Sequence, residues 1–76
     1  MMFVEFNKRV YNNGYITTKT MFNLNDICRV VECSDNLHLT NIITTDGHKH
    51  TIADEYSNVS KKIFAAEEHD GNQKYD

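Results

Sequence analysis

The sequence predicts an α+β domain, an antiparallel sheet of four to five strands made of hairpins, with one carboxy-terminal helix packed on one face. Through residues 1–52, short runs rich in β-branched and aromatic residues alternate with turn signals. A stripe of apolar residues at helical spacing follows, and no proline interrupts any predicted strand. With 76 residues in all, the chain has room for a single domain, which we place at residues 1–66.

The amino-terminal half predicts a hairpin and then a third strand. The strand-like runs "MMFVEF" and "YITTKTMF" flank "YNNGY", in which Asn13-Gly14 can adopt the positive φ of a hairpin turn. "NLND" is a break, because its side chains bond their own backbone. In the third strand, "ICRVVEC", simple alternation would put on one face Ile27, Val31 and Cys33, and on the other Cys28 and Val30.

The runs "LHLTNIITT" and "HKHTIA" predict a second hairpin, joined through Asp46-Gly47. A two-residue type I′ loop would set the pairs Thr45 with His48, Ile43 with His50, and Asn41 with Ile52. That register places on one face Ile43, His50 and Ile52, and on a wetter face Ile42, Thr44, Lys49 and Thr51. Asp54 then predicts the N-cap of a helix that runs to about Ala66, with an apolar stripe made of Tyr56, Val59, Ile63 and Ala66.

Charge separates the body from the end of the chain. Residues 67–76 hold four acids and one lysine, a net charge of −3 that equals the charge of the whole chain, so the other 66 residues are neutral. We expect this acidic tail to be disordered. The neutral body has no charge excess to attract nucleic acid, which makes nucleic acid an unfavoured partner.

The cellular setting follows from two further observations. Cys28 and Cys33 lie five apart in a predicted strand and should point to opposite faces, so we expect free thiols rather than a disulfide. No apolar run approaches the roughly 18 residues that span a bilayer. We therefore expect a soluble, cytoplasmic protein without a membrane partner.

The stretch "TTDGHKH" raises the question of a metal site. His48 and His50 would lie on the same side of a strand, roughly 6.5–7 Å apart. Zinc needs at least three protein ligands, and no spacing ties His38, Cys28, Cys33 or Asp46 to the pair. We favour a turn followed by two histidines, and we expect no metal and no cofactor.

One part of the chain resembles a known family. The residues that carry the resemblance are "NLNDICRVVE" and "IITTDGHKHTIADEYSNVSKKI". They share a strand entered by Leu24, Ile27 and Val30, the Asp46-Gly47 hairpin, Ile52, and a helix with Val59 and Ile63. This half of the chain is similar to the FlbD-like proteins, short β-rich domains known from flagellar operons with relatives in phage genomes. The resemblance implies the same fold and a small accessory role without catalysis, and it transfers no functional residue.

The sequence offers no catalytic constellation, so we expect a non-enzymatic protein that binds another protein. Residues with AT-rich codons dominate, which fits a bacteriophage or a low-GC bacterium, and a specific form is a phage-encoded inhibitor or modulator of a host enzyme or defence complex in the host cytoplasm. The expected contact residues lie on the first hairpin and the strand after it: Tyr11, Asn13, Tyr15 and Lys19. A homodimer is also expected, because so small a body has little core of its own.

Two alternatives belong to other classes. A nucleic-acid-binding regulator could stack bases on sheet aromatics with basic residues beside them, using Phe3, Phe6, Tyr15, Lys8, Arg9 and Lys19. A metal or small-nucleotide binder could use His48 and His50.

Overall fold

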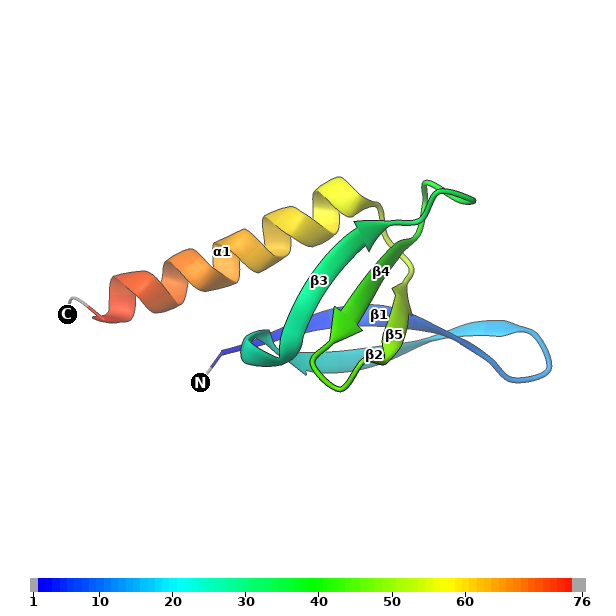
Figure 1. Ribbon diagram of the computed structural model, residues 1–76, viewed down its shortest axis with the longest axis horizontal. Coiled ribbons are helices and arrows are strands. Elements are labelled where there is room, and N and C mark those ends of the chain that lie inside the picture. Colours follow the sequence, from blue (N-terminus) through cyan, green and yellow to red (C-terminus); the bar gives the residue numbers. More distant parts are fainter. Residues whose placement is uncertain (1, 75–76) are drawn as a thin grey trace.

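The computed structural model describes residues 2–74, and within them it contains five antiparallel strands and one α-helix (Figure 1). The elements in chain order are β1 (Phe3–Tyr11), β2 (Tyr15–Asn23), a 3₁₀ turn η1 (Leu24–Asp26), β3 (Ile27–Glu32), β4 (Thr40–Thr44), β5 (Lys49–Ile52) and α1 (Tyr56–Lys74). All five strands form one sheet in the order β2-β1-β5-β4-β3. The predicted α+β class is confirmed.

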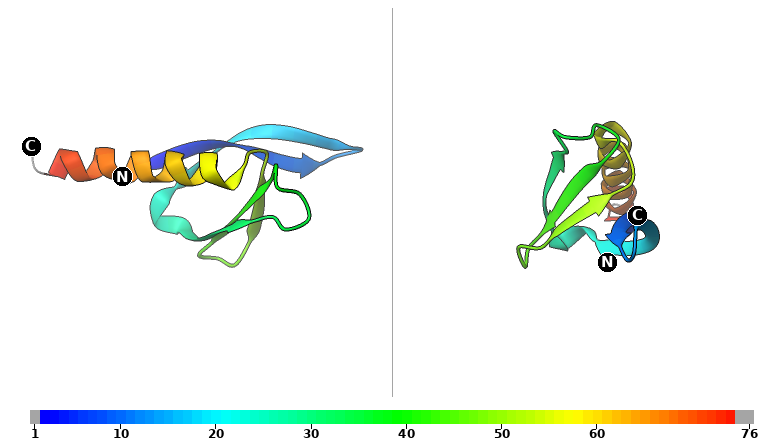
Figure 2. Two further views of the ribbon diagram at one scale, coloured as in Figure 1. Left: turned by 90° about the horizontal axis from the view of Figure 1, so that it is seen from above. Right: turned by 90° about the vertical axis from the view of Figure 1, so that its right-hand side faces the viewer.

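The sheet consists of two parts that meet at a narrow seam. Strands β1 and β2 form a long hairpin that is paired without interruption from Phe3↔Asn23 to Tyr11↔Tyr15. Strands β3, β4 and β5 form a meander, and the ladder pair between the two parts is Lys8↔Ile52. The far end of the hairpin and the helix project in opposite directions, which gives an elongated molecule of 48 × 20 × 20 Å (Figures 1 and 2).

A small apolar core lies where the hairpin, the meander and the helix meet. Its members are Val4, Phe6, Phe22, Ile42, Ile52 and Val59. Ile42, Ile52 and Val59 are 0% exposed, and the rings of Phe6 and Phe22 pack with their centroids 6.1 Å apart. Each buried side chain of this size contributes about 1.5–3 kcal/mol. The core therefore depends on contacts between segments far apart in the sequence.

The first hairpin follows the sequence closely. Asn13 has φ 56° and Gly14 has φ 129°, so both residues take the positive φ that their types tolerate. The predicted strands on either side are confirmed as β1 and β2. The predicted break after them is η1, which begins where the Asn23 side chain accepts a hydrogen bond of 3.0 Å from the Asn25 amide.

The second hairpin has a different register from the predicted one. Its loop has three residues, closed by hydrogen bonds from Gly47 N–H to the Thr44 carbonyl (2.8 Å) and from Thr44 N–H to the His48 carbonyl (3.0 Å). Gly47 has φ 87°, as expected for a type I turn followed by a bulge. The ladder therefore pairs Ile42 with His50, where the sequence predicted Ile43.

This one-residue shift moves the buried face. Ile42, predicted to lie on the wetter face, is completely buried, while Ile43 is half-buried. Strand β4 also begins later than predicted, since the residues just before Thr40 form a turn. Thr40 is buried, and its hydroxyl donates to the Asp54 carbonyl at 2.8 Å.

The predicted faces of β3 are also wrong. The pairing of β3 with β4 is irregular between Ile27 and Arg29, which makes Cys28 the extra residue of a β-bulge. As a result Ile27 and Val30 both pack against the core, although simple alternation put them on opposite faces. Cys28 is exposed and Cys33 half-buried, and both thiols are free.

Helix α1 begins at Tyr56, one residue later than an Asp54 N-cap requires. The Glu55 carbonyl accepts the first helical hydrogen bond from Val59 N–H (3.1 Å), while the Asp54 carboxylate accepts from Glu55 N–H (2.8 Å) and the Asn58 side chain (2.9 Å). Of the predicted stripe, Val59 is buried, Ile63 and Ala66 are half-buried, and Tyr56 is 41% exposed.

The helix continues beyond the predicted end at Ala66 to Lys74. Glu67 and Glu68, directly after Ala66, favour a helix, and no proline stops it. The predicted boundary of the acidic tail thus falls inside α1, and its last two residues, 75 and 76, lie outside the described part. Within residues 2–74, no helix is long and apolar enough to cross a membrane.

Candidate functional site

The β1–β2 hairpin extends well past the rest of the sheet. Its ladder continues beyond the Lys8↔Ile52 pair, so residues 9–17, here called the hairpin arm, have only each other as ladder partners among the described residues. The arm runs away from the meander and ends in a free tip (Figure 2). The arm is therefore open to contact by another molecule.

Two tyrosines form the tip of the arm. Tyr11 and Tyr15 face each other across the ladder and are 73% and 66% exposed. Their ring centroids lie 5.3 Å apart at 71°, an edge-to-face arrangement, and the Arg9 guanidinium carbon lies 3.6 Å from the centre of the Tyr15 ring. Such a cation–π contact contributes about 0.5–1 kcal/mol at an exposed site. The two rings and the guanidinium group thus hold one another in place.

Of the other two predicted contact residues, Asn13 lies beside this pair and Lys19 lies apart from it. Asn13 is in the turn and helps to form the tip. Lys19 is on the same face as Tyr15, since both have odd numbers in β2, but it lies four residues along the strand, roughly 13 Å away. The structure therefore brings together Tyr11, Asn13 and Tyr15, and leaves Lys19 at the base of the arm.

Arg9 was not among the residues predicted to contact a protein partner. It pairs with Thr17 in the ladder and lies diagonally across from Tyr15 on the same face. A two-residue loop at Asn13-Gly14 would have placed Arg9 on the opposite face from Tyr15, so the turn signal alone could not group them. The three-residue loop, which pairs Tyr11 with Tyr15, puts them on one face. The structure adds Arg9 to the tip, with Tyr11 and Tyr15.

The β4–β5 turn contains a second cluster of polar groups, centred on Asp46. Its carboxylate accepts hydrogen bonds from the Thr44 hydroxyl and from His48 N–H (3.0 Å), and lies 2.9 Å from His48 Nδ1. These hydrogen bonds, the Thr44 hydroxyl first, hold the pKa of Asp46 well below its usual range. His48 thus stabilises the turn by contacting the Asp46 carboxylate.

His50 is oriented by its neighbours on β4 and β2. Its Nε2 lies 3.2 Å from the Thr44 hydroxyl, and its ring meets that of Phe22 edge-on with centroids 5.2 Å apart. Because the Thr44 hydroxyl gives its proton to Asp46, it can only accept from His50, so Nε2 carries the hydrogen and Nδ1 is an acceptor. That Nδ1 is buried and has no hydrogen-bond partner among the described residues.

Burial lowers the pKa of His50, and the positive charge of Lys8 lowers it further. A proton added at Nδ1 would find no acceptor, which agrees with this direction. His50 is therefore neutral at pH 7. Within residues 2–74, no three His, Cys, Asp or Glu side chains are grouped so that they could hold a metal ion.

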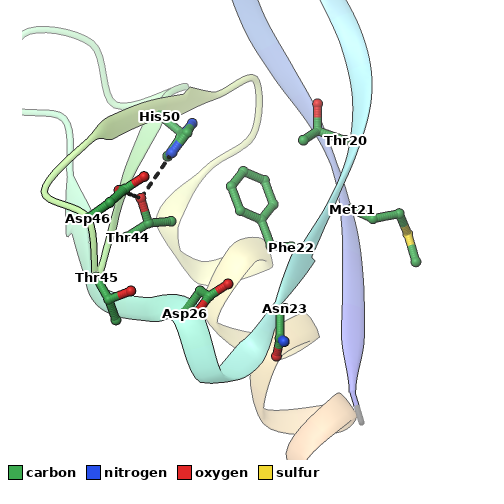
Figure 3. Close-up of a pocket in the computed structure, with 9 residues that line it drawn as sticks. All are labelled: Thr20, Met21, Phe22, Asn23, Asp26, Thr44, Thr45, Asp46 and His50. Atoms are coloured by element: carbon green, nitrogen blue, oxygen red, sulfur yellow. Dashed lines mark hydrogen bonds between the residues drawn. The ribbon is translucent and has the colours of Figure 1, made fainter.

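A cleft of about 390 Å³ opens between β2 and the β4–β5 turn (Figure 3). Its lining residues are Thr20, Met21, Phe22, Asn23, Asp26, Thr44, Thr45, Asp46 and His50. In the close-up, Phe22 projects from β2 toward His50, while the Met21 side chain points away from the other lining groups. The sequence could not reveal this cleft, because its walls come from segments about twenty residues apart.

Comparison with known proteins identifies no relative. No protein-family model matches the chain, and no curated protein or solved structure matches it either.

Proposed function

We propose that this protein is a non-enzymatic binding module that recognises another protein through the tip of its hairpin arm. The observation that carries the proposal is the pair of exposed, mutually packed tyrosines, Tyr11 and Tyr15, beyond the end of the sheet. The pair adds nothing to the apolar core, and exposed apolar surface gathered in one place marks sites of protein interaction.

The chemistry of the tip suits protein recognition. Tyrosine and arginine are enriched among the residues that dominate binding energy, because they offer large contact area together with hydrogen-bond donors. Tyr15 is already held by Arg9 and Tyr11, so less conformational entropy is lost when a partner immobilises it. A contact on the tip also leaves the core undisturbed.

Crosslinking at chosen positions tests this proposal. A photo-crosslinking amino acid replaces Tyr15 in one variant and Phe64 in another; both side chains are strongly exposed, but Phe64 lies on α1. We expect a defined adduct in a bacterial lysate from position 15 and none from position 64. Excess unlabelled protein should suppress the adduct, whereas the double variant Tyr11→Ala, Tyr15→Ala should not.

Equal adducts from positions 15 and 64, or equal competition by the double variant, would refute a binding role for the tip. Leu37→Ala serves as the matched control, because Leu37 is 59% exposed in the β3–β4 connection, outside the arm. It should compete as well as the unmodified protein. The predicted homodimer is a separate proposal, and light scattering at tens of micromolar tests it: a monomeric mass would contradict it.

A further inference from the structure

Four consecutive residues of β2, Thr20 to Asn23, line the cleft. Successive side chains of a strand point to opposite faces, so a run of four can line one cleft only if the strand presents its edge. β2 is the outermost strand of the sheet, and among the described residues no strand pairs with its outer side. The cleft is therefore bounded on one side by an open strand edge.

The hydrogen-bond pattern identifies which backbone groups point outward. Leu24 N–H donates to the Met2 carbonyl (3.1 Å), and Ala53 N–H donates to the Asn7 carbonyl (2.9 Å). The backbone groups of odd-numbered β1 residues thus point to β5, and those of even-numbered residues in both strands join β1 to β2. On β2 the odd-numbered residues, Met21 and Asn23 beside the cleft, direct their N–H and C=O groups outward.

The two edges of the sheet differ in how well they are protected. β3, the other outer strand, has six residues, a bulge at Cys28, and the charged side chains of Arg29 and Glu32. β2 has nine residues in unbroken register, no proline, and one charged residue, Lys19. Bulges, charges and short length are the usual means of blocking strand addition, and β2 lacks most of them.

The charge of the cleft restricts what can enter it. Two carboxylates line it, those of Asp26 and Asp46, and no lysine or arginine is among its lining residues. The depressed pKa of Asp46 keeps that group ionised, and His50 is neutral. Phe22 supplies an apolar wall on the β2 side of the cleft. Acidic groups beside an apolar wall fit a long basic side chain, whose stem is apolar and whose end is cationic.

We propose that an extended segment of a partner protein adds to the free edge of β2 beside the cleft and places a lysine or arginine side chain in it. The segment's backbone pairs with the outward groups of Met21 and Asn23. A side chain on the inner face of the added strand then points toward Phe22, with Asp26 and Asp46 on the walls.

A second copy of this chain does not meet the charge requirement. In an antiparallel β2–β2 pair, the outward-bonding odd residues pair with one another, and so the even residues of the second copy share the cleft face. Those residues are Ile16, Thr18, Thr20 and Phe22, none of them charged, while Lys19 falls on the opposite face. A partner with its own basic residue fits the cleft better.

Short peptides of defined sequence test the proposal directly. The probes are the acetylated, amidated peptides VTRTV, VTETV and VTRTV with N-methylated backbone amides, each titrated into the full-length ¹⁵N-labelled protein. We expect VTRTV to shift the amides of residues 19–26 and 44–50, and to bind about tenfold more tightly than VTETV, because the glutamate would meet two carboxylates. N-methylation should abolish binding, since it removes the donors needed for strand pairing.

Variants separate the cleft from the arm. Asp26→Asn should reduce the preference for VTRTV over VTETV by about threefold, because one exposed carboxylate is removed while its shape is kept. Glu67→Gln, which removes an exposed acid on α1, should leave the preference unchanged. The double variant Tyr11→Ala, Tyr15→Ala should bind VTRTV normally, so failure of the arm proposal and failure of this one are distinguishable.

Three results would overturn the proposal. Absence of shifts at millimolar VTRTV, or shifts that map outside the cleft and the β2 edge, would show that no strand adds there. Equal binding of VTRTV and VTETV would remove the charge argument. Shifts of the same amides that depend on protein concentration without peptide would mean that a second copy occupies the edge.

Discussion

The β1–β2 and β4–β5 hairpins have closely similar turn signals, Asn13-Gly14 and Asp46-Gly47, but the two turns differ in how they are held. The Asp46 turn is tied to the body: its carboxylate accepts from Thr44 and His48, and the Thr45 amide donates to the Asp26 carbonyl (2.8 Å). The Asn13 turn lies at the tip of the arm, with an internal hydrogen bond from Asn12 N–H to the Gly14 carbonyl (2.8 Å). One turn closes a cleft, and the other carries exposed tyrosines.

This difference shows that the dipeptide determines where the chain reverses, while contact with a distant segment determines whether the reversal is anchored. The Thr45 amide anchors the Asp46 turn to the Asp26 carbonyl, and Thr44 and His48 order the turn itself through hydrogen bonds to the Asp46 carboxylate. Tyr11 and Tyr15 flank the other turn, and the ring contacts that they make, with each other and with Arg9, lie within the arm. Stability and binding are therefore expected to respond differently to changes in the two hairpins.

The largest difference should follow from removing side-chain volume at the seam rather than on the arm. Ile52 is fully buried and pairs with Lys8 between the two parts of the sheet, so Ile52→Ala should lower the free energy of unfolding by about 2–5 kcal/mol. Ile16 is 49% exposed on the arm, and Ile16→Ala should change the free energy of unfolding by no more than about 0.5 kcal/mol. Urea denaturation followed by circular dichroism measures both. Equal losses would mean that the arm is part of the core.

The two turn glycines give the next largest contrast. An added Cβ would meet nothing within 4 Å at either Gly14 or Gly47, so substitution costs only backbone strain at positive φ. Gly47→Ala should lower the free energy of unfolding by about 1–2 kcal/mol. Gly14→Ala should strain its turn similarly. Because the arm can open without the rest of the sheet, the urea midpoint of global unfolding should change less than in Gly47→Ala.

Hydrogen exchange distinguishes these two outcomes. In Gly14→Ala, amides of residues 9–17 should exchange faster while those of β4 and β5 keep their protection. In Gly47→Ala, protection should fall throughout the sheet. Loss of protection in the body of Gly14→Ala would show that the two hairpins unfold as one unit.

A smaller effect should appear when the pH is lowered. The folded-state pKa of His50 lies below the ordinary 6.5, so between these two values the unfolded chain binds more protons than the folded one. His50 therefore makes its full contribution to stability above pH 6.5, and that contribution is lost as the pH falls through the folded-state pKa. In His50→Gln this decline should disappear. An unchanged decline in the variant would assign it to another group.

The smallest effect concerns the exposed carboxylate of the anchored turn. Because the pKa of Asp46 is lowered, its contribution is present above its ordinary value of 3.8 and is lost as the pH falls through its folded-state pKa. Asp46→Asn should flatten this part of the stability profile, whereas Asp35→Asn, in the β3–β4 connection, should not. Thermal melts between pH 2 and pH 5 would show the difference.

The sequence predicts the elements of this fold well and their lateral alignment less well. Both turns, η1 and the helical stripe are local features, and local propensity is enough to locate them. The register of β4 against β5 depends on a choice between loops of two and three residues, and that choice depends on hydrogen bonds that Asp46 makes to Thr44 and His48. A shift of one residue exchanged the faces of Ile42 and Ile43.

In the candidate sites, too, local groupings could be predicted from the sequence and long-range ones could not. Tyr11, Asn13 and Tyr15 are close in sequence across one turn, so the sequence was sufficient to group them. Asp26 and Asp46 come together only because η1 is bonded to the β4–β5 turn, a contact that no periodicity predicts. The bulge at Cys28 could not be predicted from the sequence either, because it depends on the pairing of β3 with β4.

The unbroken ladder between β1 and β2 also constrains how the arm can vary in length. Inserting one residue into each strand between the seam and the tip would carry Tyr11 and Tyr15 to the opposite face, whereas inserting two into each would restore their direction and move them roughly 6.5–7 Å farther out. Reach and orientation of the tip can thus be changed in discrete steps without altering a single buried residue. The hairpin provides a ready scaffold for grafted recognition loops of graded length.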